Sequence, residues 1–121
     1  MNAPLALVIE DEEDLSEIFE KALTTAGYEV EAIRDGAIAQ ERIKQVVPVM
    51  ITLDMHLPHI SGLTLLQQIR ADDRLKNTRV VVTTADAQMG ESLRGEADLI
   101  LIKPITFTQL RDLTARLLPR E

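Results

Sequence analysis

The chain has 121 residues, of which 20 are acidic and 13 are basic, and its formal net charge is -7. A chain of this length buries roughly two-thirds of its unfolded surface, so we expect one globular domain over residues 1–121. The absence of cysteine excludes disulfide scaffolds, thiolate metal sites and cysteine nucleophiles. The negative charge disfavours direct binding to nucleic acid or to an anionic membrane.

The apolar runs are far shorter than the ~20 residues that a membrane helix needs. Residues 1–4 carry none of the basic side chains that open a secretory signal, and acidic residues follow the first apolar run directly. We therefore expect a cytoplasmic protein without a membrane helix.

In chain order, residues 5–9 form an unbroken apolar run, and the short, mainly apolar segments 49–53, 80–83 and 99–102 repeat its character. Such runs predict strands that are buried on both faces, as in a parallel sheet. Residues 28–32 alternate between buried and exposed types, which is typical of an edge strand.

Helical spacing of apolar residues separates these strands. It predicts a helix over residues 15–26 that ends at Gly27, and a second helix over residues 36–46 with Asp35 as its N-cap. A third helix is expected from Ser61 to residue 71, and a last one begins after Thr106 and reaches residue 118. The second helix should place the following residues on one side: Ile38, Ala39, Arg42, Ile43 and Val46. Strands that alternate with helices predict right-handed crossovers and a parallel sheet with helices on both faces.

Carboxylates follow two of the predicted strands. Glu10 and Asp11 come after the first strand, and Asp54 comes after the strand at residues 49–53. In an open parallel sheet the binding site lies beyond the carboxyl ends of the strands. If these two strands are neighbours, three like charges meet there and need a cation, which predicts a hard divalent metal such as Mg2+.

A purely structural interpretation competes with this one. Acidic residues at 10–14 would also stabilise the first turn of a helix, and for residues 12–14 we prefer that account. Asp54 is a lone acid at the end of an apolar run, so we prefer a functional role there.

Two further strand ends carry complementary groups. Thr83 and Thr84 close the fourth strand, and Lys103 follows the fifth. A buried threonine and a solvated lysine are ordinary on their own. A hydroxyl and an ammonium group that converge on a metal-binding carboxylate, however, suit a phosphoryl group.

With these motifs the chain resembles the receiver domains of two-component response regulators over essentially its whole length. The resemblance rests on Glu10-Asp11, on residues 53–58 with Gly62 beyond, on Thr84-Ala85 and on Lys103-Pro104. It implies an α/β fold of the flavodoxin-like kind: a doubly wound, five-stranded parallel sheet of order 2-1-3-4-5 with helices on both faces.

The resemblance also implies a phosphoacceptor signalling module. Asp54 would take a phosphoryl group from a sensor histidine kinase or a phosphotransfer protein. Asp11 and Asp54 would bind Mg2+ directly, Glu10 through water and His56 through its backbone carbonyl.

The phosphoryl oxygens would be held by Thr84, the Ala85 amide and Lys103, which complete the site that the resemblance implies. The protein would then not be an enzyme, except that it would catalyse its own phosphorylation and dephosphorylation. The cognate kinase, the downstream partner, homodimer formation and membership of a longer protein are left open.

Three features depart from the family pattern. Ile100 stands where the family usually has an aromatic residue, and the interval from Thr84 to Lys103 is short and contains two glycines. We expect the fourth helix to be short or poorly ordered. How phosphorylation would then be signalled to a partner is left open. His56 is the third departure; with His59 it could contribute to a metal site, but solvated histidines are the preferred interpretation.

Two other functions compete. One is a Mg2+-dependent, phosphatase-like enzyme of similar topology, although no acid stands two positions after Asp54 and no capping insertion is present. The other is a pseudo-receiver that serves only protein contacts, which the intact set of motifs disfavours.

Overall fold

The computed structural model describes residues 3–119. The outermost residues of the predicted domain, 1–2 and 120–121, lie outside this part, as does half of the segment considered for a secretory signal. The helices and strands alternate along the chain: β1 (Leu5–Ile9), α1 (Glu13–Ala26), β2 (Glu29–Ile33), α2 (Gly36–Ile43), β3 (Met50–Asp54), α3 (Gly62–Ala71), the 3-10 helix η1 (Asp73–Leu75), β4 (Arg79–Thr84), α4 (Ala87–Ser92), β5 (Leu99–Ile102) and α5 (Phe107–Arg116).

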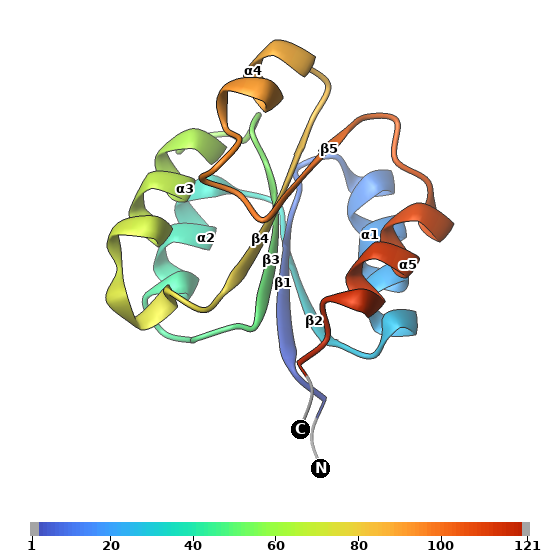
Figure 1. Cartoon of the computed structure of the whole chain (residues 1–121). Helices are drawn as coiled ribbons and strands as arrows, with labels where there is room; N and C mark the ends of the chain where they lie inside the picture. Colours follow the sequence, from blue (N-terminus) through green and yellow to red (C-terminus); the bar gives the residue numbers. More distant parts are fainter. Residues whose placement is uncertain (1–2, 120–121) are drawn as a thin grey trace.

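The five strands form one parallel sheet in the order β2-β1-β3-β4-β5, which confirms the expected topology. Helices α2 and α3 cover one face of the sheet, and α1 and α5 cover the other (Figure 1). The apolar strand residues fill two cores, one on each face, because both faces of β1, β3 and β4 are covered. None of the helices formed by residues 3–119 is long and apolar enough to cross a membrane.

Local signals explain most of the helix boundaries. Gly27 ends α1 in the left-handed conformation, with φ 119°. Asp35, Ser61 and Thr106 accept backbone hydrogen bonds as the N-caps of α2, α3 and α5. The sequence predicts the cap at Asp35 and places Ser61 and Thr106 at the starts of their helices. Helix α4 has six residues and begins after the N-cap Asp86, so the expectation of a short fourth helix is confirmed.

The prediction for α2 was wrong in two respects. The helix ends at Ile43 rather than at residue 46, and its last turn closes with the Gln45 amide donating to the Arg42 carbonyl. Pro48 disfavours a helical conformation only for the residue before it, and the chain leaves the helix earlier, in a turn at residues 44 and 45. Ile38 is 62% exposed instead of packed, because Ala39 and Ile43, one turn apart, are the residues that face the core.

Other boundaries moved by one or two residues. Strands β2 and β3 lie one residue later than predicted, β4 begins one residue early at Arg79 and ends at Thr84 as expected, and α5 stops at Arg116, two residues early. Helix α1 begins at Glu13, and its first turn carries Glu13 and Asp14, which confirms the structural account of that acidic stretch. The sequence pattern did not reveal η1, a single turn after α3.

A buried tyrosine joins the two helices on one face. Tyr28 follows α1 directly, and its hydroxyl donates a hydrogen bond of 2.8 Å to the backbone carbonyl of Thr114 in α5. Burial raises the pKa of Tyr28 to about 12, although the charge of Arg79 opposes this effect. The neutral phenol is therefore the form that the folded protein prefers.

We predict that this preference limits stability at alkaline pH. The phenol ionises near pH 10 in the unfolded chain and near 12 in the folded protein. Its contribution to stability is thus full below about pH 10 and is lost as the pH rises toward 12. Tyr28→Phe should remove this alkaline loss and cost about 1 kcal/mol of unfolding free energy at neutral pH. Tyr28 is the sole tyrosine, so phenolate absorbance follows it directly; a midpoint near 10 in the folded protein would contradict its buried hydrogen bond.

Candidate functional site

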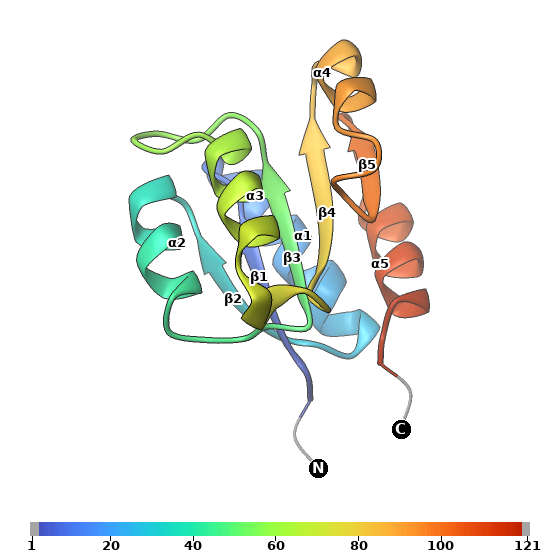
Figure 2. The same cartoon turned by 60° about the vertical axis from the view of Figure 1, so that its left-hand side comes forward.

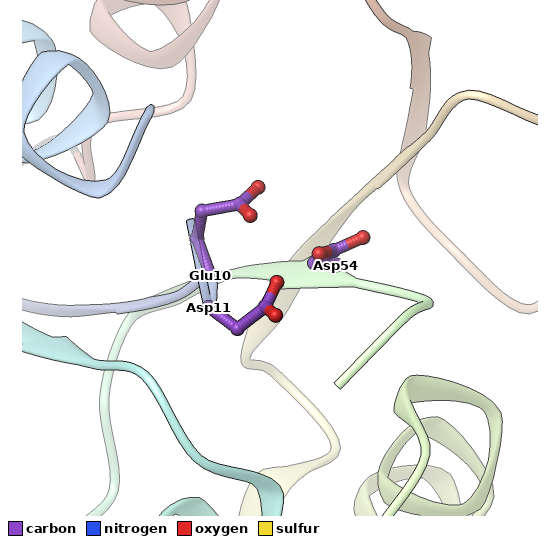
Figure 3. Close-up of side chains that lie close together, drawn as sticks. All are labelled: Glu10, Asp11 and Asp54. Carbon is purple, nitrogen blue, oxygen red and sulfur yellow. The ribbon is translucent and has the colours of Figure 1, made fainter. Parts of the chain in front are cut away.

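Three carboxylates meet at the carboxyl ends of β1 and β3. These strands are neighbours, with Ile9 paired to Leu53, so Glu10 and Asp54 lie side by side one residue further along. Glu10, Asp11 and Asp54 each offer a carboxylate oxygen, and these oxygens lie within 4.8 Å of one another. Figure 3 shows the side chains facing a common space. The grouping inferred from the sequence is the one that the fold produces.

The three acids differ in burial. Glu10 is 1% exposed and Asp54 is 2% exposed, whereas Asp11 is open to solvent. Backbone amides hold the two buried carboxylates: the Glu12 amide donates to Glu10 Oε2 at 3.2 Å, and the His56 amide donates to Asp54 Oδ1 at 3.1 Å. The acids are therefore fixed in position, with access from the side of Asp11.

Lys103 supplies positive charge to this pocket. Its Nζ lies 2.9 Å from Glu10 Oε1 and 3.5 Å from Asp54 Oδ2. Lys103 follows β5, which is separated from β3 by β4, so its long side chain reaches past the end of β4. The sequence placed Lys103 at this edge of the sheet but did not reveal its contact with Glu10.

Burial and pairing act against each other on these groups. Burial raises the pKa of Glu10, the charge of Asp54 adds to this effect, and the hydrogen bond from Lys103 only partly offsets it. Burial lowers the pKa of Lys103, but its hydrogen bond to Glu10 and the charges of Glu10 and Asp54 outweigh it, so that pKa is raised. Lys103 therefore stays an ammonium ion.

Two of the predicted phosphoryl-binding residues lie at the end of the next strand, β4. Thr84 is the last residue of β4 and is buried, and its hydroxyl oxygen accepts a hydrogen bond of 3.0 Å from the Asp86 amide. Ala85 follows in the exposed turn. Thr83, the other hydroxyl considered, is also buried and pairs with Asp54 in the sheet register.

A glycine allows the chain to pass close to the acceptor strand. A Cβ atom at Gly62 would lie 2.1 Å from the backbone oxygen of Asp54, so no larger residue fits without moving the backbone. The Gly62 amide donates to the Met55 carbonyl at 3.2 Å. Gly62 thus closes the loop that follows Asp54.

The donor set fits a hard divalent cation. Carboxylate oxygens are the ligands that Mg2+ prefers, and the one cluster of metal-ligating side chains within residues 3–119 contains no histidine. His56 and His59 are exposed, and His59 Nδ1 contacts Asp35. The pocket can thus combine a cation, a carboxylate nucleophile and an ammonium group.

Comparison with known proteins identifies related sequences. The family model of the response regulator receiver domain matches residues 6–115. The DNA-binding dual master transcriptional regulator RpaA of Synechocystis is 33% identical over 110 residues, which cover 88% of this chain and 46% of that protein. The polar-differentiation response regulator DivK of Brucella anthropi is 30% identical over 103 residues, or 83% of this chain and 84% of that protein. This chain spans about half the length of the first curated relatives that it matches.

Solved structures of response regulators have the same fold as this chain. The response regulator TrrA from Thermotoga maritima, in complex with Mg(2+)-BeF, superimposes with a TM-score of 0.82 at 27% identity. The match covers 98% of this chain and 100% of that chain. The bacteriophytochrome response regulator RtBRR gives a TM-score of 0.83 at 27% identity, with 95% and 78% covered.

We predict that Lys103→Met destabilises the protein in a pH-dependent way. The change leaves Glu10 and Asp54 buried without their ammonium partner. It should cost about 2 kcal/mol near pH 7, less than the ~3–5 kcal/mol of a fully buried pair, because Lys103 keeps some solvent contact. The deficit should shrink as the pH falls, because Glu10, whose pKa is already raised, then takes up a proton.

Urea denaturation at a series of pH values measures this effect. Lys44→Met is the matched control, because Lys44 pairs with Glu41 on the exposed surface. If the loss of unfolding free energy in Lys103→Met did not change with pH, the role of the buried carboxylates would be contradicted.

Proposed function

Because this chain belongs to the response regulator receiver domain family, we propose that Asp54 is the phosphoacceptor of a two-component phosphorelay. The observation that carries the proposal is the placement of Asp54: a buried carboxylate at the end of the central strand, 3.5 Å from the Lys103 ammonium. Family membership favours this function over a phosphatase-like enzyme or a pseudo-receiver.

The reaction requires little beyond positioning. An Asp54 carboxylate oxygen attacks the phosphorus of a phosphohistidine, so that a carboxyl O–P bond forms while the N–P bond of the donor breaks. The carboxylate is already ionised when it acts as the nucleophile, so no general base is needed. Lys103 neutralises charge on the transferred group, while the Thr84 hydroxyl and the Ala85 amide donate to its other oxygens.

We further propose that the acidic cluster holds Mg2+. Asp11 and Asp54 would bind it directly, Glu10 through water and His56 through its backbone carbonyl. When bound, the ion supplies positive charge to the phosphoryl oxygens. The support for this proposal is the close approach of three carboxylate oxygens to one another.

The partners and setting follow from the same proposal. A sensor histidine kinase or a phosphotransfer protein would supply the phosphoryl group, in the cytoplasm. The chain would form a single domain that catalyses only its own phosphorylation and dephosphorylation. RpaA is described as DNA-binding, but the net charge of -7 on this chain argues against direct contact between this domain and nucleic acid.

Asp54→Asn should abolish phosphoryl uptake and leave the fold intact, because the amide has nearly the shape of the carboxylate but is no nucleophile. Intact-protein mass after treatment with acetyl phosphate and Mg2+ measures the outcome. Asp112→Asn, at an exposed acid on α5, is the control and should gain mass as the unmodified chain does. An equal gain in the Asp54 variant would place the acceptor elsewhere.

Asp11→Ala should remove Mg2+ binding, because the remaining acids hold too little charge to strip water from a small, strongly hydrated cation. Mg2+ that binds only the folded protein raises its midpoint of thermal unfolding, and this rise should disappear in the variant. Glu12→Ala is the control, since Glu12 is the next exposed acid but lies outside the cluster. Equal Mg2+ affinity for Asp11→Ala and the unmodified protein, in a titration followed by NMR, would refute the site.

A further inference from the structure

The loop between β3 and α3, residues 55–61, is held at both ends by close backbone packing. Gly62 packs against Asp54 at the end of the loop. On the far side, the Gly36 amide at the start of α2 donates to the Pro58 carbonyl at 3.1 Å. A Cβ atom at Gly36 would lie 2.0 Å from the backbone oxygen of Ile60. Figure 2 shows this loop at the upper left, beyond the carboxyl end of β3 and above α2.

The tip of the loop has an unfavourable backbone conformation. His59 has φ 70°, the one positive value at a residue other than glycine within residues 3–119. The Ile60 amide donates to the Pro58 carbonyl at 2.8 Å, which closes a tight three-residue turn around His59. Such a conformation persists only where surrounding contacts hold it in place.

Asp35 provides the contact that holds His59. One oxygen of Asp35, Oδ1, accepts the Ala37 and Ile38 amides at 2.7 and 3.1 Å as the N-cap of α2. The other oxygen, Oδ2, contacts His59 Nδ1. A carboxylate has no proton to give, so Nδ1 is the donor. Because α2 fixes the carboxylate, His59 is attached to a rigid element.

The other end of the loop touches the acceptor. The His56 amide donates to Asp54 Oδ1, three residues before His59. The loop therefore spans from the Asp54 carboxylate to the start of α2, and its conformation decides where the His56 backbone lies.

We propose that Asp35 and His59 form a clasp that positions the β3–α3 loop, and with it the His56 backbone, at the Asp54 carboxylate. Both are positioning residues for phosphoryl uptake. This part of the inference rests on the proposed function. Without the clasp, the unfavourable turn at His59 relaxes and the His56 amide leaves Asp54 more often.

The test compares four variants and a control. His59→Ala removes the imidazole. Asp35→Ser keeps an N-cap oxygen for α2 but removes the oxygen that His59 contacts. The double variant carries both changes. His59→Asn places an amide nitrogen where Nδ1 lies and tolerates positive φ, so it should restore the clasp. Asp72→Ser, at the N-cap of η1, is the control for loss of a capping carboxylate.

Amide hydrogen exchange without metal, followed by NMR, gives the first measurement. Exchange at His56, Ile60 and Gly36 should rise roughly fivefold in His59→Ala and in Asp35→Ser, the factor expected for loss of one hydrogen bond. The double variant should match the single ones, because both break the same contact. His59→Asn and Asp72→Ser should behave like the unmodified protein.

Initial rates of phosphoryl uptake from acetyl phosphate with Mg2+ give the second measurement. They should fall severalfold in His59→Ala and Asp35→Ser and recover in His59→Asn. Unchanged exchange at the three amides, additive effects in the double variant, or unchanged uptake rates would each overturn the clasp. If the unmodified protein takes up no phosphoryl group, the proposed function fails, while the exchange data still decide whether the clasp exists.

Discussion

Two carboxylates, Glu10 and Asp54, are held almost without solvent beside one ammonium group, and the architecture of the site depends on this imbalance of charge. Two unit charges 4 Å apart interact by ~4 kcal/mol at an effective dielectric constant near 20. A domain has only ~5–15 kcal/mol of net stability. With Asp11 added, the cluster has three acids and one lysine, so the pocket is negative before any ligand binds. A divalent cation bound there would relieve that repulsion, and a phosphoryl group on Asp54 would restore negative charge beside the cation and the lysine.

The parallel sheet makes such a pocket rigid. Its hydrogen-bonding pattern continues one residue beyond β1, β3 and β5. The Glu10 amide donates to the Ile33 carbonyl, and the Lys103 amide donates to the Thr84 carbonyl. The Met55 amide, directly after Asp54, donates to the Thr83 carbonyl. Each chemical group therefore leaves the sheet from a fixed backbone position.

The segment between β4 and β5 is short, and its helix packs directly against β5. Helix α4 has six residues, and Gly90 packs against Ile100 and Ile102, where a Cβ atom would lie 3.0 Å from either side chain. Ile100 is partly buried against the core on the face of α2 and α3. The position where the resemblance leads us to expect an aromatic side chain thus makes an aliphatic contact, and β5 pairs with β4 from Leu99 to Ile102.

Much of this could be predicted from the sequence, because the relevant signals are local. Apolar runs closed by Asp54 or Lys103 indicate strands and the edge of the sheet at which they end, and N-caps such as Asp35 and Ser61 mark helix starts. Periodicity was wrong for Ile38, since a short helix with few apolar residues does not specify which side packs.

Which atoms meet was decided by tertiary structure. The contact of Lys103 with Glu10 spans most of the chain, and that of Asp35 with His59 joins residues 24 positions apart. No spacing rule links such residues, because their distance depends on strand order and loop path. The sequence by itself determined the residue types and the ends of the strands that carry them; the packed sheet decided their partners, their burial and hence the charge that the site holds.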